Sequence, residues 1–207
     1  MNIPIVFEDD WLLVVNKPAG LLTVPTPKNE SRTLTSILNK DAEERNLKYR
    51  LYPCHRIDRQ TSGLLIYAKS KSVEAKLADA FRDRAVSKKY VAFVHGKLPK
   101  NIGQISSSIE GKSALTKYRV LEARSNYSVV EISPVTGRTN QIRIHFKSIQ
   151  HPLVGEDKFA FRKDFALRFK RVCLHAKHLE FRHPETGNIV AVDSSLPEDM
   201  QKFLEGH

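Results

Sequence analysis

The sequence has few of the residues from which several common kinds of site are built. Its only two cysteines, Cys54 and Cys173, fit neither a disulfide framework nor a metal-ligand spacing. The patterns HExxH, GxGxxG, GxxxxGK[ST] and GxSxG are also absent. The sequence therefore gives no sign of a zinc site, of dinucleotide or nucleotide-triphosphate chemistry, or of the simplest hydrolase site, and we expect no metal.

Long apolar stretches are missing too. No run approaches the roughly 20 residues that a membrane-spanning helix needs. The first residues, Met1-Asn2-Ile3-Pro4, lack the charged and apolar regions of a secretory signal. Together with the scarcity of cysteine, this predicts a cytoplasmic protein without membrane contact.

What the chain does have is a moderate apolar content and a surplus of positive charge. Its 207 residues are 41% hydrophobic and 28% charged, which is typical of one large globular domain or two small subdomains that share a core. Lysine and arginine number 34 against 23 acidic residues, a net charge of +11. This surplus favours a polyanionic partner, with nucleic acid as the leading candidate. A basic protein without such a partner remains the alternative.

Apolar periodicity predicts more strands than helices. The expected strands form a hairpin over 3–15 with a further strand at Leu21–Val24, a strand at 64–68 buried on both faces, one at 88–96, three between 103 and 132, and a hairpin over 172–192. The expected helices cover 33–47, 71–84, 139–149 and 196–204, and 156–172 is expected to be a loop with a short helix. Thr139 is the expected cap of the third helix, and Pro197 lies in the first turn of the last. Strands without regular βα alternation indicate an α+β fold with a largely antiparallel sheet.

A polar stretch, His55-Arg56-Ile57-Asp58-Arg59-Gln60-Thr61-Ser62-Gly63, precedes the buried strand at 64–68. Asp58 lies between Arg56 and Arg59, and neighbouring positive charge keeps a carboxylate ionised. A surface loop with ordinary ion pairs is the simplest interpretation of such an acid.

Three more polar clusters lie at the ends of predicted elements, where rigid scaffolds usually present reactive groups. They are Lys17–Gly20, Lys88–Tyr90 and Thr136–His145. The last contains Arg138 and Arg143 near a helix start, an arrangement that suits binding of phosphate or carboxylate. A solvated helix terminus with ordinary surface charges is the alternative.

Taken together, these clusters resemble the ordered motifs of the RluA-type RNA pseudouridine synthases. Residues 55–65 resemble the signature HRLDxxTSGLL, and residues 136–145, TGRTNQIRIH, resemble TGRTHQIRxH. Asn16–Leu21 is similar to the first motif of the family and Lys89–Ala92 to its tyrosine strand. Blocks at His151–Gly155 and from Leu174 to Gly187 follow in the family's order. The resemblance extends from about residue 5 to residue 193.

The resemblance implies a fold and a set of site residues. The expected fold is α+β, a mixed, mostly antiparallel sheet in two subdomains flanked by helices with a central cleft for RNA. Residues 1–207 would form a single catalytic domain, without the S4-type RNA-binding domain that often precedes it. Asp58 would be the essential carboxylate, Tyr90 an aromatic wall or proton acceptor, and Arg143 the ion-pair partner of Asp58.

The expected RNA-binding and base-flipping residues lie in the same motifs. Arg56 would enter the RNA helix in place of the extruded uridine, and Leu174 would be an apolar wall of the pocket. The remaining candidates are His55, Lys17 and Arg138. The expected partner is 23S rRNA, tRNA or both, bound by a monomer.

The chain departs from the family pattern at three places. Ile57 replaces the usual Leu, Asn140 replaces the usual His, and Phe159-Ala160 replaces the usual Tyr-Gly. The second change places in doubt any role of an imidazole there, and the third is expected to alter a loop.

Isomerisation of uridine requires cleavage of N1–C1′ and formation of C5–C1′, so no group or electron enters overall and no cofactor is expected. A carboxylate can attack the sugar carbon or add to the ring, and the sequence leaves both routes open. Two other functions are alternatives: a non-catalytic RNA-binding or ribosome-assembly module on the same fold, and a sugar hydrolase. The hydrolase needs a second positioned carboxylate, which the motifs do not supply.

Overall fold

The computed structural model describes residues 2–160 and 167–207. The chain divides into two compact units. The first unit comprises Met1–Ser87 and His178–Ser195, and the second comprises Lys88–Lys177 and Leu196–His207. Within 156–172, expected to be a loop with a short helix, the described residues 156–160 and 167–172 contain no helix, and 161–166 lie outside the described residues.

The first unit is built on strands β1 (Ile5–Glu8), β2 (Leu12–Lys17) and β4 (Ser62–Ala68). β2 pairs antiparallel with both β1 and β4. In the pair with β4, the register extends from Leu12 opposite Ala68 to Lys17 opposite Gly63. Next to β4 lie the short β3 (Tyr52–Pro53) and β9 (Leu174–Arg182), and β10 (Ile189–Asp193) pairs with β9. β9 contributes only its residues from His178 onward to this unit.

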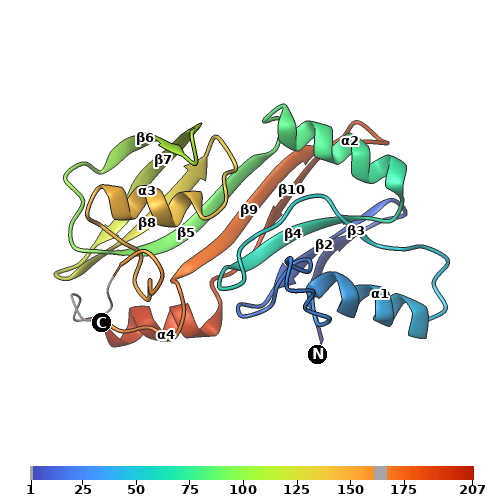
Figure 1. Ribbon diagram of the computed structural model, residues 1–207, viewed down its shortest axis with the longest axis horizontal. Helices are drawn as coiled ribbons and strands as arrows, with labels where there is room; N and C mark the ends of the chain where they lie inside the picture. Colours follow the sequence, from blue (N-terminus) through green and yellow to red (C-terminus); the bar gives the residue numbers. More distant parts are fainter. Residues whose placement is uncertain (1, 161–166) are drawn as a thin grey trace. The chain divides into compact units, whose positions relative to one another are not determined.

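Helices α1 (Leu34–Glu44) and α2 (Lys71–Arg82) cover the two faces of these strands (Figure 1). On one face, Leu64 and Ile66 of β4 pack with Val73 and Leu77 of α2. On the other, the hydroxyl of Tyr67 in β4 lies 3.0 Å from Thr35 Oγ1 in α1. All seven residues of β4 are therefore buried, as the unbroken apolar run predicted.

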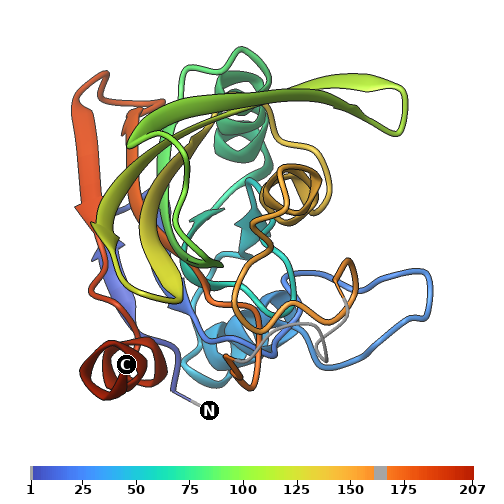
Figure 2. The same cartoon turned by 90° about the vertical axis from the view of Figure 1, so that its left-hand side faces the viewer.

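The second unit contains β5 (Ser87–His95) from Lys88 onward, β6 (Ile102–Ile109), β7 (Lys112–Ala123) and β8 (Tyr127–Pro134), with Leu174–Lys177 of β9. Its strand order is β9-β5-β8-β7-β6, and β5–β8, β8–β7 and β7–β6 pair antiparallel. Alternate residues of β5 face opposite sides, as the strand period requires. Ala92 and Val94 pack with α3 (Gln141–Ser148), and Val91 and Phe93 pack with α4 (Glu198–Gly206). Figure 2 shows these two helices on opposite sides of the strands.

The α+β class, the mostly antiparallel sheet and the division into two helix-flanked units are confirmed, while the central cleft stays a prediction. The strand at Leu21–Val24 is wrong. The carbonyls of Leu22 and Thr23 accept hydrogen bonds from the first amides of α1, those of Leu34 at 2.7 Å and Thr35 at 3.1 Å. The carbonyls of this segment therefore accept hydrogen bonds from the free amides at the start of α1 instead of pairing in the sheet.

The expected cap of α3 is also wrong. The N-cap residue is Asn140, whose φ of 54° is left-handed, and its side chain makes no capping hydrogen bond. Asparagine tolerates this conformation better than most residues. The left-handed residue separates Thr139 from the helix, which begins at Gln141.

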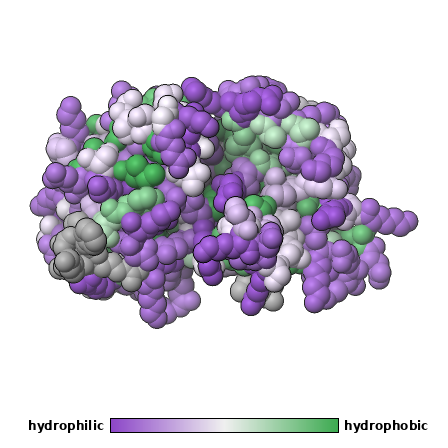
Figure 3. Space-filling view, in the orientation of Figure 1, coloured by the Kyte–Doolittle hydropathy of each residue, from purple (hydrophilic) through white to green (hydrophobic). Residues whose placement is uncertain are grey.

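The surface agrees with the composition. Hydrophilic side chains cover most of the face seen in Figure 3. Within the described ranges, no helix is long and apolar enough to cross a bilayer. Among the same residues, no three His, Cys, Asp or Glu side chains are grouped so that they could hold a metal ion.

The contact between α2 and β4 gives a stability prediction. Leu77 is fully buried in the core cluster of the first unit. We expect Leu77→Ala to lower the free energy of unfolding in urea by about 2–5 kcal/mol, because it removes buried methyl groups and leaves a cavity. Leu121→Ala, at a half-exposed leucine of β7, is the matched control and should change it by less than about 0.5 kcal/mol. Equal effects of the two substitutions would contradict this packing.

Candidate functional site

Asp58 lies in the loop between β3 and β4 of the first unit. Its carbonyl accepts a hydrogen bond from Thr61 N at 3.1 Å, which forms a tight turn. β4 begins directly after this turn, at Ser62, and is buried along its whole length. The end of the Asp58 loop is therefore attached to the most deeply buried strand of the unit.

Lys17 joins the end of β2 to the Asp58 loop. Its side chain is 0% exposed, and Nζ donates to the carbonyls of Pro18 at 2.9 Å, Leu21 at 2.7 Å and Arg59 at 3.3 Å. The Arg59 carbonyl also accepts from Gly20 N at 2.7 Å, and Arg59 Nε donates back to the Gly20 carbonyl at 3.0 Å. Two of the polar clusters seen in the sequence therefore lie together.

The predicted RNA contact of Lys17 does not fit this geometry. A lysine that binds phosphate must present its ammonium to solvent, and this ammonium is enclosed by backbone carbonyls. The residue acts on the backbone of the loop.

Thr23 fixes the other side of Asp58. Its buried hydroxyl donates to the carbonyl of Ile57 at 3.2 Å and accepts from Ile57 N at 3.5 Å. The residues before and after Asp58 are thus both held by hydrogen bonds from the segment 17–23. Sequence reasoning missed Thr23, which lies in the segment that had been expected to be a strand.

His55 and Arg56 occupy the start of the loop. Ile66 N donates to His55 Nε2 at 3.1 Å, so Nε2 is the unprotonated nitrogen of a neutral ring. The ring also packs on Phe81 of α2, with centroids 4.5 Å apart. His55 is therefore an anchor of the loop within the unit, whereas the neighbouring Arg56 is exposed.

Tyr90 and Leu174 belong to one apolar cluster of the second unit. Tyr90 lies on β5 opposite Ile132 of β8 and is half-buried. Leu174, at the start of β9, is buried in the same cluster. The structure therefore brings the predicted aromatic wall and the predicted apolar wall together.

Helix α3 is fastened to β7 by a buried polar network. Gln141 Oε1 accepts from Thr136 Oγ1 at 2.6 Å, and its Nε2 donates to Thr116 Oγ1 at 3.0 Å. His145 Nδ1 lies 2.9 Å from the same Thr116 hydroxyl. Burial lowers the pKa of His145, although the nearby Ser107 carbonyl acts in the opposite direction. Much of the TGRTNQIRIH motif thus fixes the helix itself.

Arg143 projects from α3 into a buried ion pair with Glu156. Nε and Nη2 each lie 2.7 Å from a carboxylate oxygen, so the pair is bidentate. Nη1 donates to Asn140 Oδ1 at 3.0 Å. The two charged side chains are 7% and 1% exposed. Glu156 was missed, because it follows Gly155 in a stretch without helical or strand period.

Hydrogen bonds keep Glu156 ionised although its carboxylate is buried. Burial alone raises the pKa of this carboxyl, but hydrogen bonds from Arg143 and from the amides of Lys158 and Phe159 outweigh it and lower the pKa below 4.5. Arg143 and Glu156 therefore both stay ionised at neutral pH.

The predicted residues are divided between the units. Asp58, His55, Arg56 and Lys17 lie in the first, and Tyr90, Arg138, Arg143 and Leu174 lie in the second. Arg138 is half-buried, and its Nε donates to the Ser113 carbonyl at 3.3 Å. The pairing of Arg143 with Asp58 stays a prediction.

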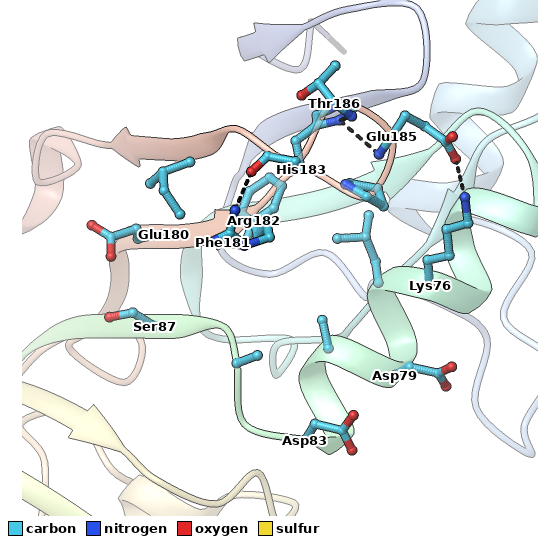
Figure 4. Close-up of a pocket in the computed structure, with 16 residues that line it drawn as sticks. Lys76, Asp79, Asp83, Ser87, Glu180, Phe181, Arg182, His183, Glu185 and Thr186 are labelled. Atoms are coloured by element: carbon cyan, nitrogen blue, oxygen red, sulfur yellow. Dashed lines mark hydrogen bonds and ion pairs between the residues drawn. The ribbon is translucent and has the colours of Figure 1, made fainter.

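A separate groove of about 820 Å³ lies in the first unit between α2 and the turn that joins β9 to β10 (Figure 4). Its wall includes an ion pair between Lys76 Nζ and Glu185 Oε1 at 2.9 Å. Asp79 and Asp83 line it from α2. None of the residues predicted for catalysis or RNA binding lines this groove, so it is not the candidate site.

Comparison with known proteins decides the family. The sequence profile of the RNA pseudouridylate synthase family matches residues 11–148, which include the Asp58 loop, Tyr90 and Arg143. The chain belongs to this family. Uncharacterized RNA pseudouridine synthase YlyB of Bacillus subtilis (strain 168) is 37% identical, over 99% of this chain and 73% of that protein.

Two further relatives confirm the RluA-type resemblance. Dual-specificity RNA pseudouridine synthase RluA of Haemophilus influenzae (strain ATCC 51907 / DSM 11121 / KW20 / Rd) is 34% identical over 92% of this chain and 91% of that protein. Ribosomal large subunit pseudouridine synthase D of Nitrosomonas europaea (strain ATCC 19718 / CIP 103999 / KCTC 2705 / NBRC 14298) is 37% identical over 97% of this chain and 64% of that protein. The chain is therefore an RNA pseudouridine synthase, an isomerase that acts on RNA.

Solved structures show the same fold. Human RNA Pseudouridylate Synthase Domain Containing 4 matches with a TM-score of 0.83 at 23% identity, over 98% of this chain and 92% of that one. Human RNA Pseudouridylate Synthase Domain Containing 1 matches with a TM-score of 0.75 at 26% identity, over 99% and 94%.

Because Lys17 is buried, we expect its substitution to lower the stability of the fold without removing a contact to RNA phosphate. Lys17→Met should lower the free energy of unfolding by about 1–3 kcal/mol, because buried carbonyls lose their donor. The salt dependence of RNA binding should not change, whereas loss of a phosphate-binding lysine reduces the slope by about 1. Arg56→Ala, at an exposed arginine of the same unit, is the comparison and should reduce that slope. A reduced slope in Lys17→Met would show that the ammonium reaches RNA.

The lowered pKa of Glu156 predicts a pH-dependent contribution to stability. A carboxyl whose pKa is lower in the folded state stabilises the fold above its unfolded value, 4.5, and this contribution is lost as the pH falls through the folded value. Glu156→Gln lacks this titration. In urea unfolding, the deficit of Glu156→Gln relative to wild type should therefore shrink as the pH is lowered below 4.5. A deficit that stays constant or grows would be inconsistent with the lowered pKa.

Proposed function

We propose that Asp58 is the catalytic carboxylate with which this enzyme converts uridine to pseudouridine in ribosomal or transfer RNA. The observation that supports this role best is the fixation of the Asp58 backbone from both sides by Thr23 and Lys17. Such a loop can hold a reactive side chain in one position on a rigid element, as catalysis requires. A surface loop with ordinary ion pairs does not need two buried side chains to hold it.

The reaction rearranges one nucleotide. The N1–C1′ bond breaks, the uracil turns, and C5 bonds to C1′; C5 loses a proton and N1 gains one. An ionised Asp58 can attack C1′ or add to the uracil ring, and both routes balance without a cofactor.

Tyr90, Leu174 and Arg143 are the proposed partners of Asp58. Tyr90 and Leu174 would contact the uracil, and the tyrosine hydroxyl is a proposed proton acceptor. Arg143 would keep Asp58 ionised and directed. A guanidinium has five N–H donors, so the bidentate pair with Glu156 is compatible with a second carboxylate.

RNA binding would depend on exposed and half-exposed cations. Arg56 is exposed at the start of the proposed catalytic loop, and we propose that it occupies the space left by the extruded uridine. Extrusion costs a few kcal/mol, part of which an inserted side chain can offset. Arg138 and the net charge of +11 would supply affinity for phosphates.

The proposed targets come from the relatives, one named for the large ribosomal subunit and one for dual specificity. We propose 23S rRNA, tRNA or both, modified by one catalytic domain over 1–207. The monomeric state and the cytoplasmic location stay predictions. The alternative of a non-catalytic RNA-binding or ribosome-assembly module is not favoured, because the named relatives are synthases.

Substitution of Asp58 tests the proposal. With RNA labelled with tritium at uridine C5, formation of the C5–C1′ bond releases tritium to water. Asp58→Asn should abolish this release while RNA binding persists, because the amide keeps the shape but cannot act as a nucleophile. Asp10→Asn, at an exposed acid of the same unit, is the control and should retain wild-type activity. Substantial tritium release by Asp58→Asn would refute the assignment.

A further inference from the structure

Arg143 is held from several sides by residues of its own unit. Glu156 binds Nε and Nη2, Asn140 binds Nη1, and the ring of Phe159 lies 5.1 Å from the guanidinium carbon. We propose that Glu156 is a positioning residue of the reaction, which fixes the direction in which Arg143 presents its guanidinium. This inference rests on the proposed function, in which Arg143 directs Asp58.

The contacts of α3 fix the backbone of Arg143 but leave its side chain to be fixed by other groups. The backbone of α3 is already held by the hydrogen bonds of Gln141 and His145 and by the burial of Phe146. An arginine side chain has several rotatable bonds and loses much freedom when it is fixed. A bidentate carboxylate defines both the position and the plane of the guanidinium.

Glu156 is itself attached to the strand that carries Tyr90. Its Oε1 accepts from the amides of Lys158 at 2.8 Å and Phe159 at 3.2 Å. The segment just before it pairs with β5, since Val154 N donates to the Phe93 carbonyl at 2.8 Å. Glu156 therefore links the position of Arg143 on α3 to the strand of Tyr90.

Two departures from the family pattern meet at Arg143. Asn140 stands in place of the usual His and accepts a hydrogen bond from Nη1. Phe159 stands in place of the usual Tyr and contacts the guanidinium through its ring. These two substitutions therefore change the surroundings of one side chain, to which Glu156 contributes two contacts of 2.7 Å.

A purely structural role explains this arrangement poorly. Removal of two charges from water is costly, and well-packed apolar side chains often stabilise a protein as well as a buried ion pair does. The pair instead gives a fixed, charged donor group. That property is useful to a reaction that depends on an oriented carboxylate.

The test compares Glu156→Gln with a matched control. Arg171 and Asp199 form a second bidentate pair in the same unit, with N–O distances of 2.6 and 2.9 Å. The substrate is total RNA from cells that lack the gene, labelled with tritium at uridine C5. Glu156→Gln should lower kcat about 10²-fold, the effect of a misplacement of about 1 Å, with little change in KM. Asp199→Asn should leave kcat unchanged.

Further variants separate positioning from folding. Glu156→Asp keeps the charge on a shorter side chain and should have an intermediate kcat. In an Arg143→Ala background, Glu156→Gln should cause no further decrease, because its effect passes through Arg143.

A wild-type kcat in Glu156→Gln, or an equal decrease in both backgrounds, would overturn the positioning role and leave the proposed function intact. Absence of tritium release by the wild-type enzyme would instead overturn the proposed function itself.

Discussion

The buried ammonium of Lys17 is the interaction on which the placement of Asp58 depends. A cation taken out of water loses several kcal/mol of hydration, and here the carbonyls of Pro18, Leu21 and Arg59 offset that loss. They come from both segments that Lys17 connects, the turn after β2 and the loop before β4. Neither segment can move without leaving a buried charge with fewer partners. The Asp58 loop is therefore attached, through the Arg59 carbonyl, to the end of the strand from which Lys17 extends.

The second unit uses a different charge for the same purpose. Arg143 is fixed by a buried carboxylate, and α3 by hydrogen bonds to Thr116 of β7. In each unit a buried ionic group holds the proposed catalytic machinery, while exposed Arg56 and half-buried Arg138 remain available to follow the shape of an RNA. This division suits an enzyme that needs a precise reacting geometry and tolerant contacts with phosphates.

Local pattern was enough to predict most of the fold. The apolar run after Gly63 indicated a strand buried on both faces, and β4 is one, because the alternating faces of an antiparallel sheet are both covered by helices here. The helix expected at 71–84 was predictable from the spacing of its apolar residues, and it forms over Lys71–Arg82. The motifs likewise predicted which loops carry the candidate site residues.

Contacts between distant segments were not predictable. Thr23 contacts Ile57, and Arg143 contacts Glu156, but no periodicity in the sequence relates the members of either pair. The same reason explains the prediction that Lys17 contacts RNA. A lysine in a loop is usually exposed, and only the folded structure shows that backbone carbonyls enclose this one.

The central claim is that this chain makes pseudouridine in cellular RNA through Asp58. Pseudouridine mapping of total RNA tests it most directly, in the parent cells, in cells without the gene, and in cells that carry wild type or Asp58→Asn in its place. The account predicts that one or more uridines of rRNA or tRNA lose their modification with the gene, regain it with wild type, and do not regain it with Asp58→Asn. Identical maps for all four, or restoration by Asp58→Asn, would contradict it.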